Sequence, residues 1–366
     1  MAHINEGFMM KKQLLSTLIP VLLFSAATNA AELYKAEDGS HIDLYSRLGF
    51  NITNKGTNDQ DTRGVFDGRI GLSGAQTINE HADVIGMAQY QVGAAEYANS
   101  LDAGSSDFTA RYVWVGIDGH EYGAIKGGRV DSGLIMFTDI GDVFATSDVS
   151  MARQAGMVDR TAVQVFRQDG TLQYQNTIGN FDVSAAYILG NDTSALDYGY
   201  NAAVRYTLDM GDAGTLAPVI SYQKTKADDS NLNPDAEYQF WGVGTRYYLN
   251  KLMLGALYSQ DEVDGIYAGT STDKVMEFTA VYDFNDDWAF RAGYRSLEND
   301  DGDELELKDT TFEVQYKLTN MSSIYTTYEL RNGENGRSLA GGGVRDTGFG
   351  GDADENFYSV GIRFEI

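Results

Sequence analysis

The chain has 366 residues, a formal charge of −26 at pH 7, no cysteine, 41 glycines, 23 tyrosines and 3 prolines. So acidic a chain excludes nucleic acid as a partner, because phosphate binding needs a basic surface. The lack of cysteine excludes a disulfide framework. Many tyrosines and glycines with so few prolines favour sheet over helix.

The N-terminus has the order of parts of a secretory signal peptide. Lys11 and Lys12 precede an apolar run over residues 14–26, and small residues then lead to Ala30, after which we expect cleavage. The run is too short for a membrane-spanning helix. Residues 1–8 stand before a second start-like methionine pair and are expected to be an upstream-start extension.

The expected mature chain, residues 31–366, is a single domain with no linker. Its formal charge is about −27, because cleavage of the signal peptide removes Lys11, Lys12 and Glu6, which together carry a net charge of +1. No later apolar run approaches the length of a membrane-spanning helix. If the chain crosses a membrane, it must do so as a closed barrel, since lipid leaves no other way to satisfy the backbone.

Apolar and polar residues alternate along the mature chain with the period of a β-strand. Segments of about ten residues suit tilted strands that cross a hydrocarbon layer. In the fourth segment, Tyr112 and Trp114 are expected on the lipid face and Arg111 on the lumen face. We count sixteen segments, at residues 41–52, 66–73, 84–92, 111–114, 123–130, 172–176, 181–189, 202–208, 216–222, 241–248, 252–258, 276–284, 288–295, 312–318, 324–330 and 358–366.

The connections alternate in length. Short turns are predicted at residues 79–83, 118–123, 209–214, 250–251, 285–287 and 319–322, and most connections between them are long and acidic. Aromatic residues gather near segment ends, as in the interfacial girdles of outer-membrane barrels, and a soluble β-sandwich would lack this regularity. The fold expected is all-β, a 16-stranded antiparallel transmembrane β-barrel.

Several local motifs resemble the general diffusion porins of Gram-negative bacteria. They are the mature start A-E-L-Y-K-A-E-D-G-S-H-I-D-L-Y-S-R, the strand motifs G-R-I-G-L-S-G and A-R-Y-V-W-V-G-I, and the later segments A-P-V-I-S-Y-Q-K-T-K and T-R-Y-Y-L-N-K. The first two-fifths of the mature chain agree best. The chain departs from the enteric pattern in lacking P-E-F-G-G and in ending with Ile366 where phenylalanine is usual.

The resemblance implies a homotrimer in which a long stretch after the fifth strand, here residues 131–159, folds into the lumen and narrows it. It also implies a basic wall facing acidic residues of this loop. The basic candidates are Arg47, Arg69, Arg111, Arg167 and its competitor Arg160, and neighbouring carboxylates are expected to hold them. The acidic candidates are Asp139, Asp142 and Asp148. Each could instead be a solvated residue, a wall salt bridge or a loop anchor.

The last segment resembles an assembly signal that closes the barrel against the strand near Ile42. Its candidate residues are Tyr358, Gly361, Phe364 and Ile366. Residues Tyr358, Val360, Ile362, Phe364 and Ile366 are expected to face lipid, and the residues between them the lumen.

Catalysis, a metal and a cofactor have no support in the sequence. Histidine is scarce, and no phosphate loop or zinc spacing is present. The acidic runs 228–237 and 298–304 do not fit calcium-loop spacing and are expected to be solvated extracellular loops, with weak divalent bridging to lipopolysaccharide as the alternative.

We therefore expect an outer-membrane pore for passive diffusion of small hydrophilic solutes and ions, weakly cation-selective because of the acidic charge. Its partners would be outer-membrane lipid, lipopolysaccharide and the solutes. Two alternatives stay open. A substrate-specific channel should show a track of lumen aromatics, hinted at by Tyr45, Tyr238, Phe240 and Tyr248; an adhesin or receptor barrel would act through its loops.

Overall fold

The computed structural model describes residues 30–55, 62–92, 108–146, 150–191, 193–334 and 353–366. Apart from Ala30, the predicted signal peptide lies outside these residues, and so does the candidate Asp148. Within them, no helix is long and apolar enough to cross a membrane.

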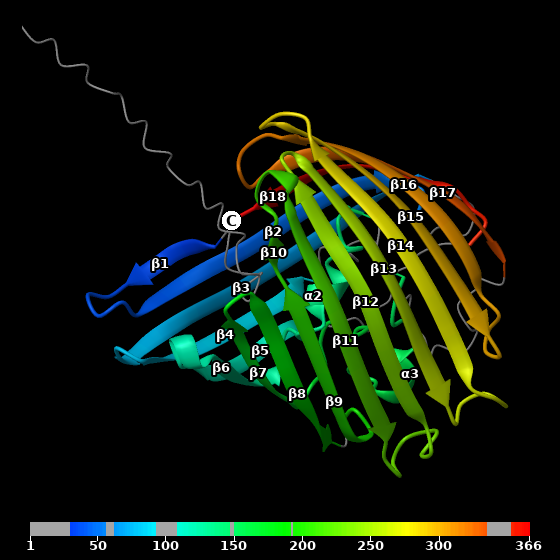
Figure 1. The fold of residues 1–366 in the computed structure, drawn as a ribbon, viewed down its shortest axis with the longest axis horizontal. Helices are drawn as coiled ribbons and strands as arrows, with labels where there is room; N and C mark the ends of the chain where they lie inside the picture. Colours follow the sequence, from blue (N-terminus) through cyan, green and yellow to red (C-terminus); the bar gives the residue numbers. More distant parts are fainter. Residues whose placement is uncertain (1–29, 56–61, 93–107, 147–149, 192, 335–352) are drawn as a thin grey trace, which may run out of the picture.

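Strands make up nearly all of the regular structure (Figure 1). The first half holds β1 (Ala31–Lys35), β2 (His41–Thr53), β3 (Arg63–Asn79), β4 (Ala82–Val92), β5 (Phe108–Asp118), β6 (Ala124–Arg129), β7 (Thr171–Ile178), β8 (Phe181–Asn191) and β9 (Leu196–Tyr206). The second holds β10 (Leu208–Asp209), β11 (Thr215–Ala227), β12 (Glu237–Leu249), β13 (Leu252–Asp264), β14 (Ser271–Asp283), β15 (Trp288–Asp300), β16 (Glu306–Lys317), β17 (Ser323–Glu334) and β18 (Phe357–Glu365). The described part of the chain also holds four one-turn helices, η2 (His120–Tyr122), α2 (Ile135–Thr138), α3 (Ala155–Val158) and η3 (Gly211–Ala213).

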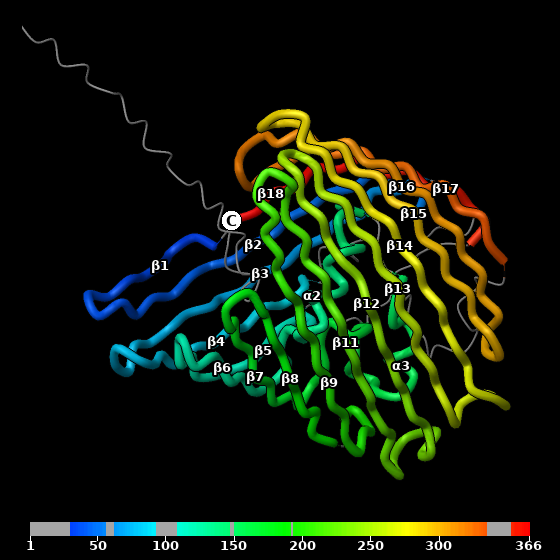
Figure 2. Tube along the Cα trace, viewed as in Figure 1, coloured from blue at the N-terminus to red at the C-terminus, as the bar shows by residue number. Residues whose placement is uncertain are grey.

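Sixteen of these strands, β2 to β9 and β11 to β18, close into an antiparallel barrel, as the alternation predicts. Each pairs with the next in sequence, β9 pairs with β11, and β18 returns to pair with β2 (Figure 2). The short β1 pairs with the start of β2, beside the end of β18. Closure leaves no long open edge, which is how a sheet can stand in lipid.

The outer face of the barrel is apolar and the inner face polar over most strands. On β18, Val360, Ile362 and Phe364 are nearly half exposed on the outer surface, while Ser359 is buried inside. The predicted lipid-facing residues of the closing strand are thus on the outside where a hydrocarbon layer would cover them.

β5 departs from the predicted parity. Val113, Val115 and Ile117 are its outward residues, so Tyr112 and Trp114 face inward, contrary to expectation. A β-bulge explains how Arg111 also points inward: Gln89 pairs with Tyr112 and the next residue with Ala110, leaving Arg111 unpaired. A bulge places two consecutive side chains on one face, and the local alternation of apolar and polar residues does not indicate where a bulge occurs.

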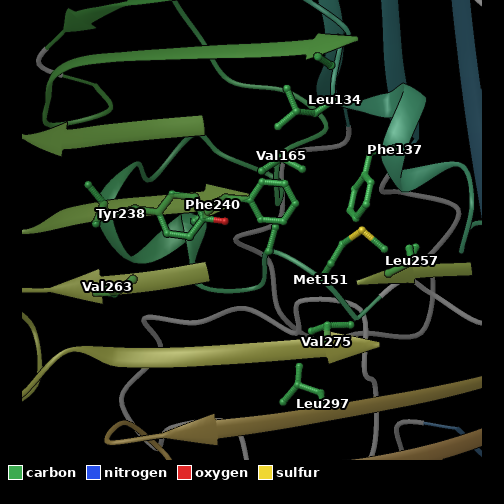
Figure 3. Close-up of a cluster of buried hydrophobic side chains, with 14 of the residues drawn as sticks. Leu134, Phe137, Met151, Val165, Tyr238, Phe240, Leu257, Val263, Val275 and Leu297 are labelled. Carbon is green, nitrogen blue, oxygen red and sulfur yellow. The ribbon is translucent and has the colours of Figure 1, made fainter. Parts of the chain in front are cut away.

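The inward loop, residues 130–170, joins β6 to β7 and enters the barrel. Its helices α2 and α3 pack against β11 and β12 on the inner side (Figure 1). Apolar side chains of the loop meet apolar residues on the inner face of β12 to β15 and form a buried cluster (Figure 3). Members include Phe137, Met151, Phe240, Leu257 and Leu297. This half of the barrel is therefore filled rather than water-lined.

The acidic run 298–304 is not the solvated loop that its composition suggests. β15 continues to Asp300 and β16 begins at Glu306, so only residues 301–305 connect them. Asp303 bonds Arg153 of the inward loop, with Nη1–Oδ2 and Nη2–Oδ1 distances of 2.5 and 2.7 Å. The connection between β8 and β9 is also shorter than expected, since β8 ends at Asn191 and β9 begins at Leu196.

Candidate functional site: the pore constriction

Polar contacts fix the backbone of the inward loop to the wall. Arg246 of β12 donates to the carbonyl oxygen of Asp139, and Thr279 Oγ1 of β14 donates to that of Ile140 at 2.8 Å. Further along, Glu313 and Glu277 accept the backbone N–H groups of Ala145 and Ser150 at 2.7 and 3.1 Å. Buried backbone groups in a loop need such partners, so the loop follows one path across the wall.

Arg153 is the most heavily bonded side chain of the loop. It donates to both carboxylate oxygens of Asp273 on β14, at 2.7 and 2.8 Å, and to Asp303. The next residue, Gln154, donates to Asp261 at 3.3 Å and accepts from Ser271 Oγ at 2.7 Å. Sequence reasoning missed this anchor, because nothing local links Arg153 to Asp273 and to Asp303 in the β15–β16 connection, both more than a hundred residues away.

The opposite wall carries the predicted arginines. Arg47 of β2 pairs with Glu365 of β18, and Arg69 of β3 lies 3.9 Å from Asp67. The expected carboxylate support is wrong for Arg111, whose Nε and Nη1 donate to Gln89 and Gln91 at 2.9 and 3.3 Å. These acceptors are neutral amide oxygens, so they do not neutralise the positive charge of Arg111.

The ring of Tyr112 contacts two arginines, Arg111 and Arg167. The guanidinium of Arg111 lies 5.8 Å from the ring centroid of Tyr112, and that of Arg167, from the inward loop, lies 5.4 Å from it. Cation–π attraction offsets part of the repulsion between the two charges. Of the two competing arginines, the structure brings Arg167 to this position. Arg160 is exposed, and its backbone N–H reaches Ser194 in the β8–β9 connection at 3.5 Å.

Two further arginines extend this basic wall and were not among the predicted constriction residues. Arg363 of β18 donates through Nη2 to the carbonyl of Ala145 at 2.8 Å. Arg129, at the end of β6, bonds Asp169 Oδ1 at 2.7 Å. Arg363 was expected to face the lumen from the alternation of β18, but its contact with the loop depends on the folded chain.

The acidic candidates of the loop have different surroundings. Asp142 is exposed, while Asp139 is partly buried beside Arg246. Burial raises the pKa of Asp139 to about 6, the Asp142 carboxylate adds to the shift, and Arg246 opposes it. Of these two carboxyl groups, Asp139 has the raised pKa, so its charge changes near pH 6.

Asp159, at the end of the predicted loop, is buried and serves as an anchor. Its Oδ1 accepts from the Thr161 N–H and hydroxyl, both at 2.8 Å, and its Oδ2 accepts from Gln168 at 2.8 Å. All three bonds stay within the inward loop, so Asp159 holds the loop's own fold and is neither solvated nor bonded to the barrel wall through them.

β18 makes the contacts expected of the strand that closes the barrel against β2. Gly361 pairs with Asn51, Phe364 with Leu48, and Ile366 exchanges two backbone hydrogen bonds with Ser46, both at 2.9 Å. The hydroxyl of Tyr325 on β17 donates to Asn51 Oδ1 at 2.7 Å across β18 at Gly361. Tyr358 bonds Thr62 beyond the end of β2.

Comparison with known proteins identifies the family of this chain. The model of the family described as Gram-negative porin matches residues 17–336. Outer membrane porin F of Xenorhabdus nematophila is 26% identical over 305 residues, covering 76% of this chain and 79% of its own. The fold is also that of Salmonella typhi OmpF in complex with daunomycin, with TM-score 0.69, 17% identity, and 92% and 100% of the two chains covered.

A trimer form of OmpT, an outer membrane protein of Vibrio cholerae, is similar as well. Its TM-score is 0.65 at 17% identity, with 89% of this chain and 99% of that chain covered. Porins are channels rather than enzymes. With its closed sixteen-stranded barrel and a family match over most of its length, this chain belongs to the Gram-negative porin family and is an outer-membrane porin.

Proposed function

We propose that the pore carries out passive diffusion of small hydrophilic solutes and ions with weak cation selectivity, and that the chain is exported by residues 1–30 and assembles as a homotrimer. The observation that carries the proposal is the inward loop. It is fixed to β12 to β18 and leaves Asp142 exposed, while Arg47, Arg69, Arg111 and Arg167 supply the basic side.

The proposed selectivity follows from the balance of charges. Carboxylates neutralise Arg47 and Arg69, so Arg111 and Arg167 are the positive charges that amides and an aromatic ring hold. The whole chain carries −26, which creates a potential that concentrates cations near the pore. Cations are favoured by this field and resisted locally by wall arginines such as Arg111 and Arg167, so the preference is weak.

A substrate-specific channel is less well supported. Of the aromatics expected along the lumen, Tyr238 and Phe240 are fully buried, and Phe240 packs against Phe137 of the inward loop with ring centroids 5.8 Å apart. A solute in the lumen does not reach these rings. Tyr45 and Tyr248 alone form no track.

The trimer is proposed from likeness to relatives, and the outer-membrane lipid and lipopolysaccharide contacts follow from the location. Chemical cross-linking of purified protein and unheated gel electrophoresis test the trimer. A single-protomer species under both conditions contradicts it.

Planar-bilayer recording of the purified protein tests the pore itself. A salt gradient should give a reversal potential of cation-selective sign, and conductance should fall smoothly with the size of added neutral sugars. An anion-selective reversal potential contradicts the selectivity, a saturable preference for one sugar favours the specific channel, and absence of conductance favours the adhesin or receptor.

A further inference from the structure

Four inward positions of the wall carry no side chain where the inward loop lies against them. They are Gly242 and Gly244 on β12, Gly255 on β13 and Gly293 on β15, here called the glycine seat. Glycine inside a strand weakens it and often marks a close approach of other atoms. Since these positions face the barrel interior, where polar side chains are usual, the loop is the group that approaches.

Atoms of the loop fill the place of each missing β-carbon. A β-carbon on Gly242 would lie 2.5 Å from Phe137 Cζ, and one on Gly244 would lie 2.6 Å from Ile140 Cδ1. On Gly255 its nearest neighbour would be Thr279 Oγ1 of β14, with Ile140 Cγ2 of the loop 2.9 Å away, and on Gly293 it would lie 2.8 Å from Phe144 Cζ. All four distances are well inside van der Waals contact, so the loop touches the backbone of the wall.

Two residues of the seat lie in one row across the sheet. Gly255 pairs with Thr279 and Thr279 with Gly293, so these residues form one row over β13, β14 and β15. Thr279 also bonds the carbonyl of Ile140. The side chains of Phe137, Ile140 and Phe144, spaced by three and four residues, therefore point to one side of the loop, toward the wall.

Polar anchors alone do not fix the depth of the loop. Hydrogen bonds from long side chains such as Arg246 and Arg363 can lengthen or rotate, whereas contact between a ring and a strand backbone is short and steep in energy. Phe137 is completely buried, and Figure 3 shows its ring beside Met151, so it has no room to retreat.

We propose that the glycine seat sets the size limit of the pore: its four residues are positioning residues that let the inward loop lie at its greatest depth, leaving the widest lumen. A side chain at the seat lifts the loop toward the opposite arginines and narrows the passage. The proposal rests on the proposed diffusion function, because it concerns the width of that pore.

Gly242→Ala and Gly293→Ala test the proposal, since the nearest loop atoms at each site belong to a single phenylalanine ring, that of Phe137 at Gly242 and that of Phe144 at Gly293. Single-channel conductance should fall by roughly one third, and the sugar size limit should shift to smaller sugars, because both follow the open cross-section. The double variants Gly242→Ala/Phe137→Leu and Gly293→Ala/Phe144→Leu remove the ring atoms that clash and should restore the conductance. Gly49→Ala is the matched control: it adds a methyl group to the inner face of β2 with only ordinary contacts.

Unchanged or increased conductance in both single variants overturns the proposal, and so does failure of both double variants to restore it. Heat-modifiable migration on gels shows whether each variant forms a barrel. If one seat variant does not fold, the other decides, because the two sites contact different rings. Absence of conductance in the unaltered protein is a separate result, which refutes the proposed function itself.

Discussion

Arg153 and Asp273, 120 residues apart in the chain, form a bidentate ion pair inside the barrel. Their Nε–Oδ2 and Nη2–Oδ1 distances are 2.7 and 2.8 Å, and the two side chains are 5% and 0% exposed. A buried, doubly bonded pair fixes both the position and the orientation of the loop segment that carries it.

Asp273→Ala should loosen the inward loop while the barrel remains closed. The variant removes two of the four hydrogen bonds of Arg153, and because Asp303 still pairs with its charge, the cost should stay below the about 3–5 kcal/mol of leaving a buried charge unpaired. Open-channel current noise should therefore rise. Lys274→Ala is the control on the same strand: its pair with Asp300, at 2.6 Å, is 45% and 56% exposed, so solvent screens it and its loss should have little effect on the loop. Equal noise in the two variants contradicts this role for Arg153.

Arg167→Ala should increase cation selectivity. A unit charge about 8 Å from the ion path contributes about 0.5 kcal/mol in water, or roughly a two-fold change in the permeability ratio. Arg160→Ala should leave the ratio within experimental error, because Arg160 is exposed by the β8–β9 connection. Reversal potentials in a salt gradient measure both. The opposite ranking would assign the constriction to Arg160.

Selectivity should depend on pH through Asp139. Because its pKa in the folded protein, about 6, is above the ordinary value of 3.8, the docked loop takes up a proton between these values. Loop docking is then most favourable below pH 3.8 and weakens as the pH rises through 6. Asp139 is neutral at pH 5 and charged at pH 7.5, so cation selectivity should be lower at pH 5.

The variant Asp139→Asn isolates this group. It should show at pH 7.5 the reduced selectivity that the unaltered protein shows at pH 5, and its own change between the two pH values should be smaller. A full pH response in the variant would place the titrating group elsewhere.

Gly361→Val should impair closure of the barrel. A β-carbon at Gly361 would lie 2.6 Å from the Tyr325 ring, under the hydrogen bond that links Tyr325 to Asn51. Deleting residues 364–366 should have a stronger effect, since it removes the bonds between Ile366 and Ser46 and the partner of Arg47. Heat-modifiable migration measures closure. Val360→Ala, on the outer face, is the control. Normal trimers from the truncated chain would contradict the role of the last residues in closing the barrel.

The sequence by itself determined the barrel. Alternation is a property of neighbouring residues, so it predicts sixteen strands and the outer faces of most of them, β5 excepted, without knowledge of distant contacts. It also indicated that a long segment after the fifth strand differs from the rest. The outward orientation of Val360, Ile362 and Phe364 could be predicted in this way, because one face of the strand meets lipid and the other meets the polar interior of the barrel. The pairing of β18 with β2 was expected from the resemblance of the last segment to an assembly signal.

Only the tertiary structure decided which wall the inward loop occupies and which side chains stand opposite it. The bulge that turns both Arg111 and Tyr112 inward, the anchor of Arg153 on Asp273 and the seating of Phe137 on Gly242 all join parts of the chain with no local relationship. Such contacts depend on the shape of the closed barrel, since packing is matched in space rather than along the chain. For that reason a glycine at position 242, unremarkable in the sequence, becomes a contact point for the loop in the fold.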